Sequence, residues 1–360
     1  MGKTMTWIGL DVHARSVHAA LVDAETGELR RQRLGGQVEE VVGFLAEQRG
    51  PVQAVYEAGP TGFGLARAAA AAGVEVMLVA PGKTPRAAAD RIKTDQRDAE
   101  LLVRLLMAGS LRAIHLPSVA QEAARDLVRA REALRQDLMR ARHRVSKLLL
   151  RYGRVYPKDR GTWTVAHRDW LAAQRFDEPA LELAYLDALA SVDGLMARRA
   201  VLEQHLARLA TSAELWPAVA RLRAFRGIDT LTALGLVCEI GDFTRFERAA
   251  ALSAWLGLVP SIYQSGEHTS RGAITKTGSQ HARRLLVEAA WHYLRPPRVG
   301  QALRNRQDGQ PAEILQIAWR AQHRLYRTHT RLRERGKHGN IATVAAAREL
   351  AGFIWAAATA

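Results

Sequence analysis

Four acidic residues in the first hundred positions lie in patterns that could bring their carboxylates together. Asp11 falls in an alternating apolar run, residues 7–12, and Glu57 closes a second such run, residues 52–57, so both are expected on strands. Asp95 and Asp98 open a helical pattern, and residues three apart share one helix face. Clustered carboxylates repel each other unless a cation neutralises them. The pattern predicts bound Mg²⁺, two ions with Mn²⁺ as an alternative, and phosphodiester chemistry.

The elements that must position these residues follow from the apolar periodicity of residues 1–110. Strands are expected at 7–12, 17–22, 28–34, 52–57 and 75–79. Helices are expected at 38–47, at 64–72 and from Asp95 onward. Three strands followed by alternating helices and strands is the order of an RNase H-like mixed sheet. A turn-rich basic segment, residues 81–86, precedes the last helix and would either lie beside a phosphate backbone or form a solvated loop.

The middle of the chain is patterned as long helices. Leu127, Leu134, Ala141 and Leu148 recur every seven residues, and a second leucine-rich stretch covers residues 181–210. Arg131 interrupts the offset row of the first seam. The two stretches could pair as an antiparallel hairpin or associate between chains, and oligomerisation is the favoured interpretation. Residues 152–178, between them, are expected to be irregular.

The last part, residues 216–360, is patterned as helices around one informative loop. Residues 225–234 resemble the turn of a helix-hairpin-helix, in which backbone amides bind a phosphate. Residues 257–278 are rich in glycine and hydroxyl groups, carry Arg271 and Lys276, and lead into a basic helix at 280–294. A serine in such a loop could attack a phosphorus atom. Most loop serines form turns or caps, however, so the residue pattern alone does not single out Ser265.

Composition favours a polyanionic partner. The 360 residues include 52 Lys and Arg against 36 Asp and Glu, a formal charge of +16. Nucleic acid is the simplest partner for this excess, and an arginine-rich solvated surface is the alternative.

The single cysteine, Cys238, excludes an internal disulfide and a cysteine-cluster metal site. No zinc site is expected, because His13, His18 and His115 lack cysteine partners at ligand spacing. Residues 59–62 lack the Walker lysine, so ATP is not expected. No membrane-spanning segment is expected, and the protein is expected in the cytoplasm.

A resemblance to a known family rests on several blocks in order along the chain: residues 8–13, 56–58, 93–99, 264–278, 283–291 and 347–353. Together they resemble the insertion sequence 110 family of DEDD transposases, the bridge recombinases, over essentially the whole chain. The resemblance implies a RuvC-like nuclease domain at 1–112, a helical coiled-coil and oligomerisation region at 113–215, and a helical transposase domain with a serine loop at 216–360. The expected fold class is therefore α/β plus all-α.

The resemblance also implies roles for particular residues. Asp11, Glu57, Asp95 and Asp98 would be the metal-binding tetrad and Ser265 the nucleophile, giving a phosphoserine link to DNA. Relatives commonly carry a second serine before the nucleophile, whereas this chain has Gln264, so Ser261 is the close rival. Eight basic residues near the motifs are expected to contact nucleic acid: Lys83, Arg86, Lys93, Arg97, Arg271, Lys276, Arg283 and Arg284.

The partners implied by the resemblance are donor DNA, target DNA and a structured non-coding RNA made from the element itself. Because the serine and the tetrad fall in different domains, either domain closure or a second protomer of a dimer or tetramer is expected to unite them. The implied location is the bacterial cytoplasm, associated with the nucleoid. Two rival functions are a RuvC-like junction-resolving nuclease that uses water and a non-catalytic nucleic-acid scaffold. The first leaves the serine loop without a role, and the second leaves the four carboxylates unexplained.

Overall fold

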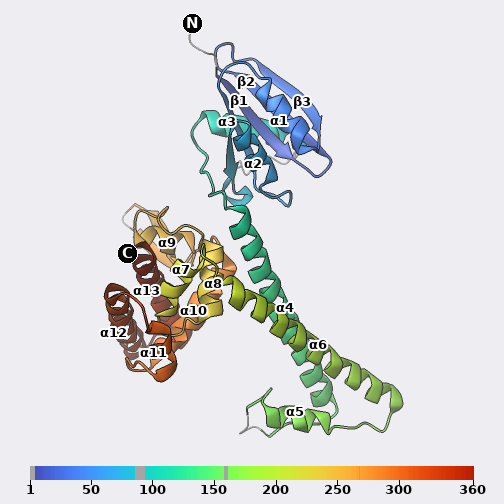
Figure 1. The fold of residues 1–360 in the computed structure, drawn as a ribbon, viewed down its shortest axis with the longest axis vertical. Helices are drawn as coiled ribbons and strands as arrows, with labels where there is room; N and C mark the ends of the chain where they lie inside the picture. Colours follow the sequence, from blue (N-terminus) through green and yellow to red (C-terminus); the bar gives the residue numbers. More distant parts are fainter. Residues whose placement is uncertain (1–4, 86–93, 158–160, 267) are drawn as a thin grey trace. The chain divides into compact units, whose positions relative to one another are not determined.

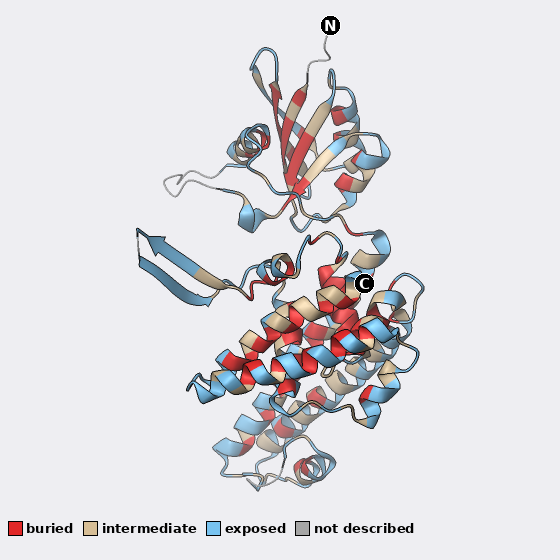
Figure 2. Ribbon diagram, turned by 90° about the vertical axis from the view of Figure 1, so that its left-hand side faces the viewer, coloured by how far each residue is buried: buried red, intermediate tan, exposed pale blue. Residues whose placement is uncertain are grey.

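The computed structural model describes residues 5–85, 94–157, 161–266 and 268–360. The chain divides into two compact units, Met1–Ser118 and Val119–Ala360 (Figure 1). Each unit has its own buried core, visible as the red segments of Figure 2. The first unit is a mixed α/β sheet and the second is helical, which confirms the coarse fold class predicted from the sequence. The predicted three-part division of the chain stays a prediction.

The first unit is built on a five-stranded sheet of order β3-β2-β1-β4-β5. The strands are β1 Thr6–Val12, β2 Ser16–Asp23, β3 Leu29–Gly35, β4 Val52–Glu57 and β5 Glu75–Val79. The first three pair antiparallel, whereas β1–β4 and β4–β5 pair parallel. This is the strand order predicted from the apolar periodicity, and it places β1 and β4 side by side, with their carboxyl ends at the same edge of the sheet.

Helices cover both faces of this sheet. Helices α1 Val38–Ala46 and α2 Gly64–Ala71 pack on the face that buries Ile8 and Leu10. Helix α3, Asp95–Met107, covers the opposite face, where Ala99 and Val103 pack against β2 residues. Alternation along β1 therefore directs Gly9 and Asp11 toward α3 while Ile8 and Leu10 face α1 and α2. A short 3-10 turn, η1 Pro81–Lys83, follows β5.

Gly9 is the point where α3 comes closest to β1. A Cβ atom added at Gly9 would lie 2.1 Å from the Ala99 carbonyl oxygen and 2.6 Å from the Val103 nitrogen. Both are backbone atoms of α3, so no side-chain rotation could relieve the overlap. The missing side chain thus lets α3 lie against β1 and brings the first turn of α3 near the end of that strand.

We expect Gly9→Ala to destabilise the first unit by about 1–3 kcal/mol, the usual effect of overpacking a core. Calorimetric unfolding of the full chain measures this effect. Gly43→Ala is the matched control, because a Cβ added at this exposed position of α1 meets nothing within 4 Å. An alanine in a helix interior is about 0.5–1 kcal/mol more favourable than glycine, so Gly43→Ala should stabilise the unit slightly. A Gly9→Ala protein as stable as the parent would contradict the role given to Gly9.

The second unit begins with a pair of long helices, α4 Val119–Arg151 and α6 Pro179–Leu209. They run antiparallel within the chain, because Arg131 of α4 bonds Glu203 of α6 while Arg142 contacts Met196. Arg131, which interrupts the predicted seam, thus has an ionic partner on the facing helix. Leu138 and Val145 are buried in the core between the helices. The apolar seam of α4 is thus covered by α6 of the same chain, as in the antiparallel hairpin that was one of the two predicted arrangements. Packing of this seam requires no second chain.

Residues 152–178 were expected to be irregular, and this expectation is wrong in part. Helix α5, Val165–Ala172, forms there, capped by the Thr164 hydroxyl. Leu171 is buried against the α4–α6 core, and the Tyr185 hydroxyl donates to its carbonyl oxygen at 2.7 Å. The aromatic residues of the segment pack as a small cluster around His167.

Most of the remaining helices of the second unit share one buried core. These remaining helices are α7 Trp216–Arg223, α8 Thr230–Ile240, α9 Ala249–Trp255, α10 Gln280–Ala290, α11 Gln301–Gln307, α12 Ala312–Glu334 and α13 Gly339–Thr359, with a 3-10 turn η2 Trp291–Leu294. Eight consecutive residues of α8, from Ala233 to Ile240, are buried. Among them is Glu239, which accepts a two-point hydrogen bond from Arg129 of α4 at 2.9 and 3.0 Å. Burial alone would raise the pKa of Glu239, but hydrogen bonds from His281, Arg129 and Ser279 lower it to about 2. The pair therefore stays ionised and anchors α4 to α8.

Residues 260–274 form a two-stranded antiparallel sheet rather than the expected loop. Strand β6, Pro260–Ser265, pairs with β7, His268–Ile274. Gly266, at φ +56°, makes the left-handed step of the turn after β6. Ile262 and Tyr263 are 60% and 71% exposed, so little of this hairpin is buried within the chain.

One described helix, α13, is long and apolar enough to cross a membrane by length and composition alone. Its buried residues include Ala346, Leu350 and Ile354, which belong to the main core of the second unit. This packing is that of a core helix.

Candidate active site

The carboxylates predicted to bind metal lie at one edge of the sheet of the first unit. Asp11 is the penultimate residue of β1 and Glu57 the last residue of β4. The parallel register pairs Leu10 with Tyr56, so Asp11 and Glu57 each follow a paired residue on neighbouring strands. Glu57 shares a face with Val55, which packs against α3. Both acidic residues therefore belong to the α3 side of the sheet.

Helix α3 contributes the other two carboxylates from its first turn. The Thr94 hydroxyl accepts a hydrogen bond from the Arg97 amide and fixes the start of the helix. Asp95 and Asp98 follow directly, and acidic residues are favoured at a helix N-terminus by the helix dipole. One ligand atom each of Asp11, His13 and Asp95 lie within 4.8 Å of one another.

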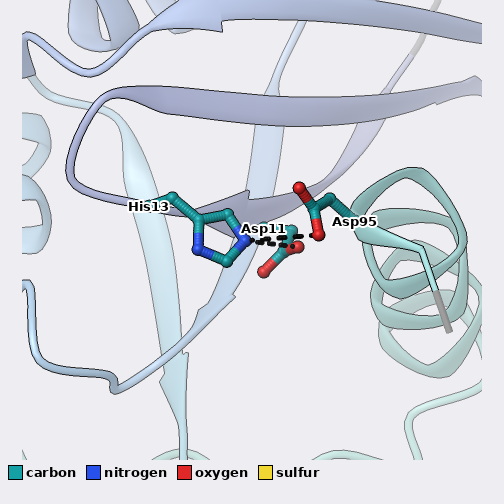
Figure 3. A group of neighbouring side chains, drawn as sticks. All are labelled: Asp11, His13 and Asp95. Carbon is teal, nitrogen blue, oxygen red and sulfur yellow. Dashed lines mark hydrogen bonds and ion pairs between the residues drawn. The ribbon is translucent and has the colours of Figure 1, made fainter.

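His13 points toward two of these carboxylates, Asp11 and Asp95, as Figure 3 shows. Its Nε2 is 3.1 Å from Asp11 Oδ2 and 3.6 Å from Asp95 Oδ1. His18, opposite Asp11 in the β1–β2 register, approaches Asp95 at 3.7 Å. Sequence reasoning considered both histidines only as zinc ligands and missed this proximity. The signal was present, because residues two apart on a strand share a face, and His13 is two residues beyond Asp11.

The electrostatics of Asp11 show that negative charge is concentrated here. Burial raises the pKa of Asp11, the His13 ring lowers it, and the charges of Asp95 and Asp98 raise it again, with an upward net shift. Carboxylate oxygens are the ligands that Mg²⁺ prefers, and a divalent cation would offset the mutual repulsion. The donor set therefore fits a hard divalent metal ion.

If Asp11 binds a metal ion, replacing it should change the stability of the folded protein both without Mg²⁺ and with it. Because the folded pKa of Asp11 is raised, its favourable contribution is present at low pH and is lost as pH rises through that pKa. At neutral pH the metal-free parent should thus be less stable than Asp11→Asn. Mg²⁺ at a hundred times its Kd should stabilise the parent by about 2.7 kcal/mol, and Asp11→Asn should lose most of this gain.

Calorimetry in EDTA and in Mg²⁺ tests this prediction. Asp23→Asn is the matched control, since Asp23 ends β2 and accepts hydrogen bonds from the Glu25 and Thr26 amides of the following turn. It should keep the full Mg²⁺ gain. An equal gain in Asp11→Asn and in the parent would exclude Asp11 as a ligand.

Ser265 lies in the second unit, at the end of β6, and is exposed. Among the described residues, no hydrogen bond engages its hydroxyl. The rival Ser261 donates its hydroxyl to the Ala273 carbonyl oxygen across the hairpin at 3.2 Å. A Cβ at Gly272 would lie 2.4 Å from the Ser261 oxygen, so this hydroxyl sits in a close-packed position.

The predicted nucleic-acid contacts fall into three groups. Arg86 and Lys93 lie outside the described residues. Lys83, Arg271 and Lys276 are exposed and remain available to a ligand, and Arg97 is exposed in the first turn of α3.

The third group, Arg283 and Arg284, is engaged inside the protein. Arg283 donates to the Leu256 and Thr277 carbonyl oxygens, and Arg284 pairs with Glu132 and Glu288. These two arginines hold α10 in place, and their contact with nucleic acid stays a prediction.

The expected phosphate-binding turn at residues 225–234 is also filled by the protein itself. The Asp229 carboxylate accepts the Thr232 amide at 2.8 Å and caps α8. Phe225 and Ile228 are fully buried, and a Cβ at Gly227 would lie 2.6 Å from the Ala289 carbonyl oxygen. The turn is a packing element, with no described space for a phosphate.

Comparison with known proteins agrees with this geometry. Residues 8–153 match a DEDD transposase model of the IS110 type, and residues 219–303 match the transposase IS116/IS110/IS902 family. The chain is 39% identical over 359 residues to y4qE of Sinorhizobium fredii, a protein named as a transposase, covering 98% of this chain and 88% of that protein. The chain belongs to the IS110 family of transposases. It is also 31% identical to the transposase for insertion sequence element IS1533 of Leptospira borgpetersenii, over 93% of this chain and 99% of that protein.

The two matches to the IS110 family cover both parts of the chain that carry the predicted site residues. The DEDD match spans all four predicted carboxylates and the whole of α4. The second match begins in α7 and ends in α11, so it includes the exposed β6–β7 hairpin. The function is thus that of an insertion-sequence transposase, and family membership implies DNA partners and a divalent metal ion.

Proposed function

We propose that this transposase cuts and rejoins DNA strands with a Mg²⁺-dependent carboxylate site and a serine nucleophile. The convergence of Asp11 and Asp95, with Asp98 on the same helix turn and Glu57 on the neighbouring strand, carries the proposal. These four residues would hold the metal, which when bound supplies positive charge to stabilise the transition state at phosphorus.

Ser265 is proposed as the group that stores the broken phosphodiester bond. Its oxygen forms a bond to phosphorus while the bond from phosphorus to the leaving strand oxygen breaks. The proton of the hydroxyl passes to that leaving oxygen, directly or through solvent. One ester replaces another, so the strand can be rejoined to a different end without an external energy source. The exposed Arg271 and Lys276 neutralise phosphate charge near Ser265.

The proposal also names the partners. Donor and target DNA are joined under the guidance of a structured RNA transcribed from the element, and the chain acts as a homo-oligomer, a dimer or tetramer, in the bacterial cytoplasm. The antiparallel α4–α6 pair supplies the coiled-coil region of this assembly. The excess of arginine and lysine supports polyanionic partners of this kind.

Competition binding tests the RNA guidance. RNA transcribed from the DNA flanking the gene should displace a labelled probe at concentrations at least about tenfold lower than random RNA of equal length, a difference of about 1.4 kcal/mol. Both affinities should fall steeply with salt, because binding releases counterions. Equal competition by the two RNAs would remove the guide and leave a general polyanion binder.

A further inference from the structure

Helix α12 carries a basic exposed face that neither the metal site nor the serine hairpin uses. Its inner side buries Ile317, Ala321 and Leu325 in the core of the second unit. Six of the exposed residues on its outer side form what we call the α12 arginine face: Trp319, Arg320, His323, Arg324, Arg327 and Arg331. The helix lies at the edge of the helical part of this unit, so the face is open to solvent (Figure 1).

The four arginines of this face form one stripe. Their spacing of four, three and four residues keeps them on the same side of the helix, and the stripe spans about 16 Å at 1.5 Å per residue. Arg324 is paired with Glu349 of α13 at 2.9 Å. Among the described residues, no ion pair engages Arg320, Arg327 or Arg331. Uncompensated like charges at this spacing repel each other, so an anion binding along the stripe would be favoured.

A hollow of about 410 Å³ lies along the stripe. Its lining joins three guanidinium groups with hydroxyl groups: Arg324, Tyr326, Arg327, Thr328, Thr330, Arg331 and Glu334. Guanidinium groups and the hydroxyls of Tyr326 and Thr330 can donate hydrogen bonds to phosphate oxygens, and arginine matches phosphate geometry with two parallel hydrogen bonds. The Thr328 hydroxyl instead donates to the Glu349 carboxylate. Glu334 marks one end of the hollow, where a phosphate would be repelled.

Trp319 adds an aromatic surface to the other end of the stripe. Its side chain is 44% exposed, and its ring lies 4.5 Å from the His323 ring in an edge-on arrangement. Exposed aromatic rings beside basic residues are typical of sites where unpaired bases stack. An acidic protein segment would use the arginines but would leave the exposed indole without a role, so the aromatic ring favours nucleic acid.

We propose that the α12 arginine face binds a nucleic-acid strand with an unpaired base stacked on Trp319 and phosphates along Arg324, Arg327 and Arg331. The inference rests on the proposed function for the chemical class of its partner, and it adds a strand-binding site away from the carboxylates and the serine. Single-stranded DNA and single-stranded RNA share the required chemistry.

Binding of labelled 15-residue probes to the full chain in EDTA, where metal-dependent cleavage is absent, tests the proposal. The probes are a single-stranded DNA, a single-stranded RNA of the same sequence, and the DNA duplex. Trp319→Ala should weaken single-strand binding about tenfold and change duplex binding little, as expected for the loss of one stacked base. Arg327→Gln with Arg331→Gln should weaken binding and lower the salt slope for single strands by about 1.4, because two phosphate contacts are lost.

The control is Arg175→Gln with Arg208→Gln, which removes two exposed charges from the α5–α6 loop and the end of α6. It should alter single-strand affinity far less than the α12 pair. If the parent protein binds one of the two single-stranded probes more tightly than the other and this preference disappears in Trp319→Ala, the preferred probe identifies the natural partner as DNA or RNA, and the proposal is supported.

Three results would overturn the proposal. The first is single-strand binding by the α12 variants equal to that of the control. The second is equal loss of single-strand and duplex binding in Trp319→Ala. The third is loss of self-association with retained oligonucleotide binding, which would assign the face to another protein surface. Probe binding is measured in EDTA and cleavage in Mg²⁺, so a failure of this site and a failure of the proposed catalysis give different results.

Discussion

Asp11→Asn is expected to reduce DNA strand cleavage in Mg²⁺ by at least about 10²–10³-fold, the effect of removing one group that stabilises transition-state charge. Glu57→Gln, Asp95→Asn and Asp98→Asn should have effects of the same order, because each removes one negative oxygen donor from the same edge of the sheet. Nucleic-acid affinity should hardly change, since the basic surfaces are untouched. Cleavage of labelled DNA by each purified variant measures the first effect, and a binding titration in EDTA measures the second.

The control for this series is again Asp23→Asn, which removes a carboxylate from the same unit at the end of β2, away from the cluster. It should cleave at nearly the parent rate. A variant of the four that also cleaved at the parent rate would not belong to the metal site. A loss of cleavage accompanied by a matching loss of folding, seen by calorimetry, would assign that residue a structural role instead.

Ser265→Ala is expected to eliminate the covalent protein–DNA adduct while leaving Mg²⁺ binding unchanged. The hydroxyl is the only group proposed to hold the phosphoryl bond, and the four carboxylates of the other unit remain in place. A denaturing gel of labelled DNA incubated with the protein shows the adduct directly, and calorimetry in Mg²⁺ shows the retained metal binding.

Ser261→Ala is the matched control, because it removes the nearest rival hydroxyl on the same strand. That hydroxyl bonds the Ala273 carbonyl oxygen, so its loss should weaken the hairpin by about 1 kcal/mol and leave the adduct intact. An adduct that persists in Ser265→Ala and vanishes in Ser261→Ala would move the nucleophile to Ser261.

The sheet and its acidic residues could be predicted because local pattern decided them. Period-two alternation placed the strands within one or two residues of their observed bounds, and strand ends placed Asp11 and Glu57. The β6–β7 hairpin escaped prediction because its strands are exposed on both faces and so lack alternation. Helix α5 escaped because its stability comes from the burial of Leu171 against distant helices.

Contacts between distant segments could not be read from the sequence at all. Arg283 and Arg284 follow the same basic pattern as a nucleic-acid contact, yet α10 turns both toward backbone carbonyls and acidic residues of the fold. The tight approach at Gly9 depends on where α3 crosses the sheet. The charge and type of a residue indicate which interactions its side chain can make. Which group it binds in the folded protein depends on the packing of the whole unit.

Mass spectrometry of the adduct formed by the parent protein tests the central claim most directly. The protein is incubated with DNA and Mg²⁺, digested with a protease and a nuclease, and the nucleotide-bearing residue is located by fragmentation. We expect the nucleotide mass on Ser265, and its absence when Mg²⁺ is replaced by EDTA. Cut DNA ends with no nucleotide on any serine would show that water is the attacking group and would contradict the proposed recombinase mechanism.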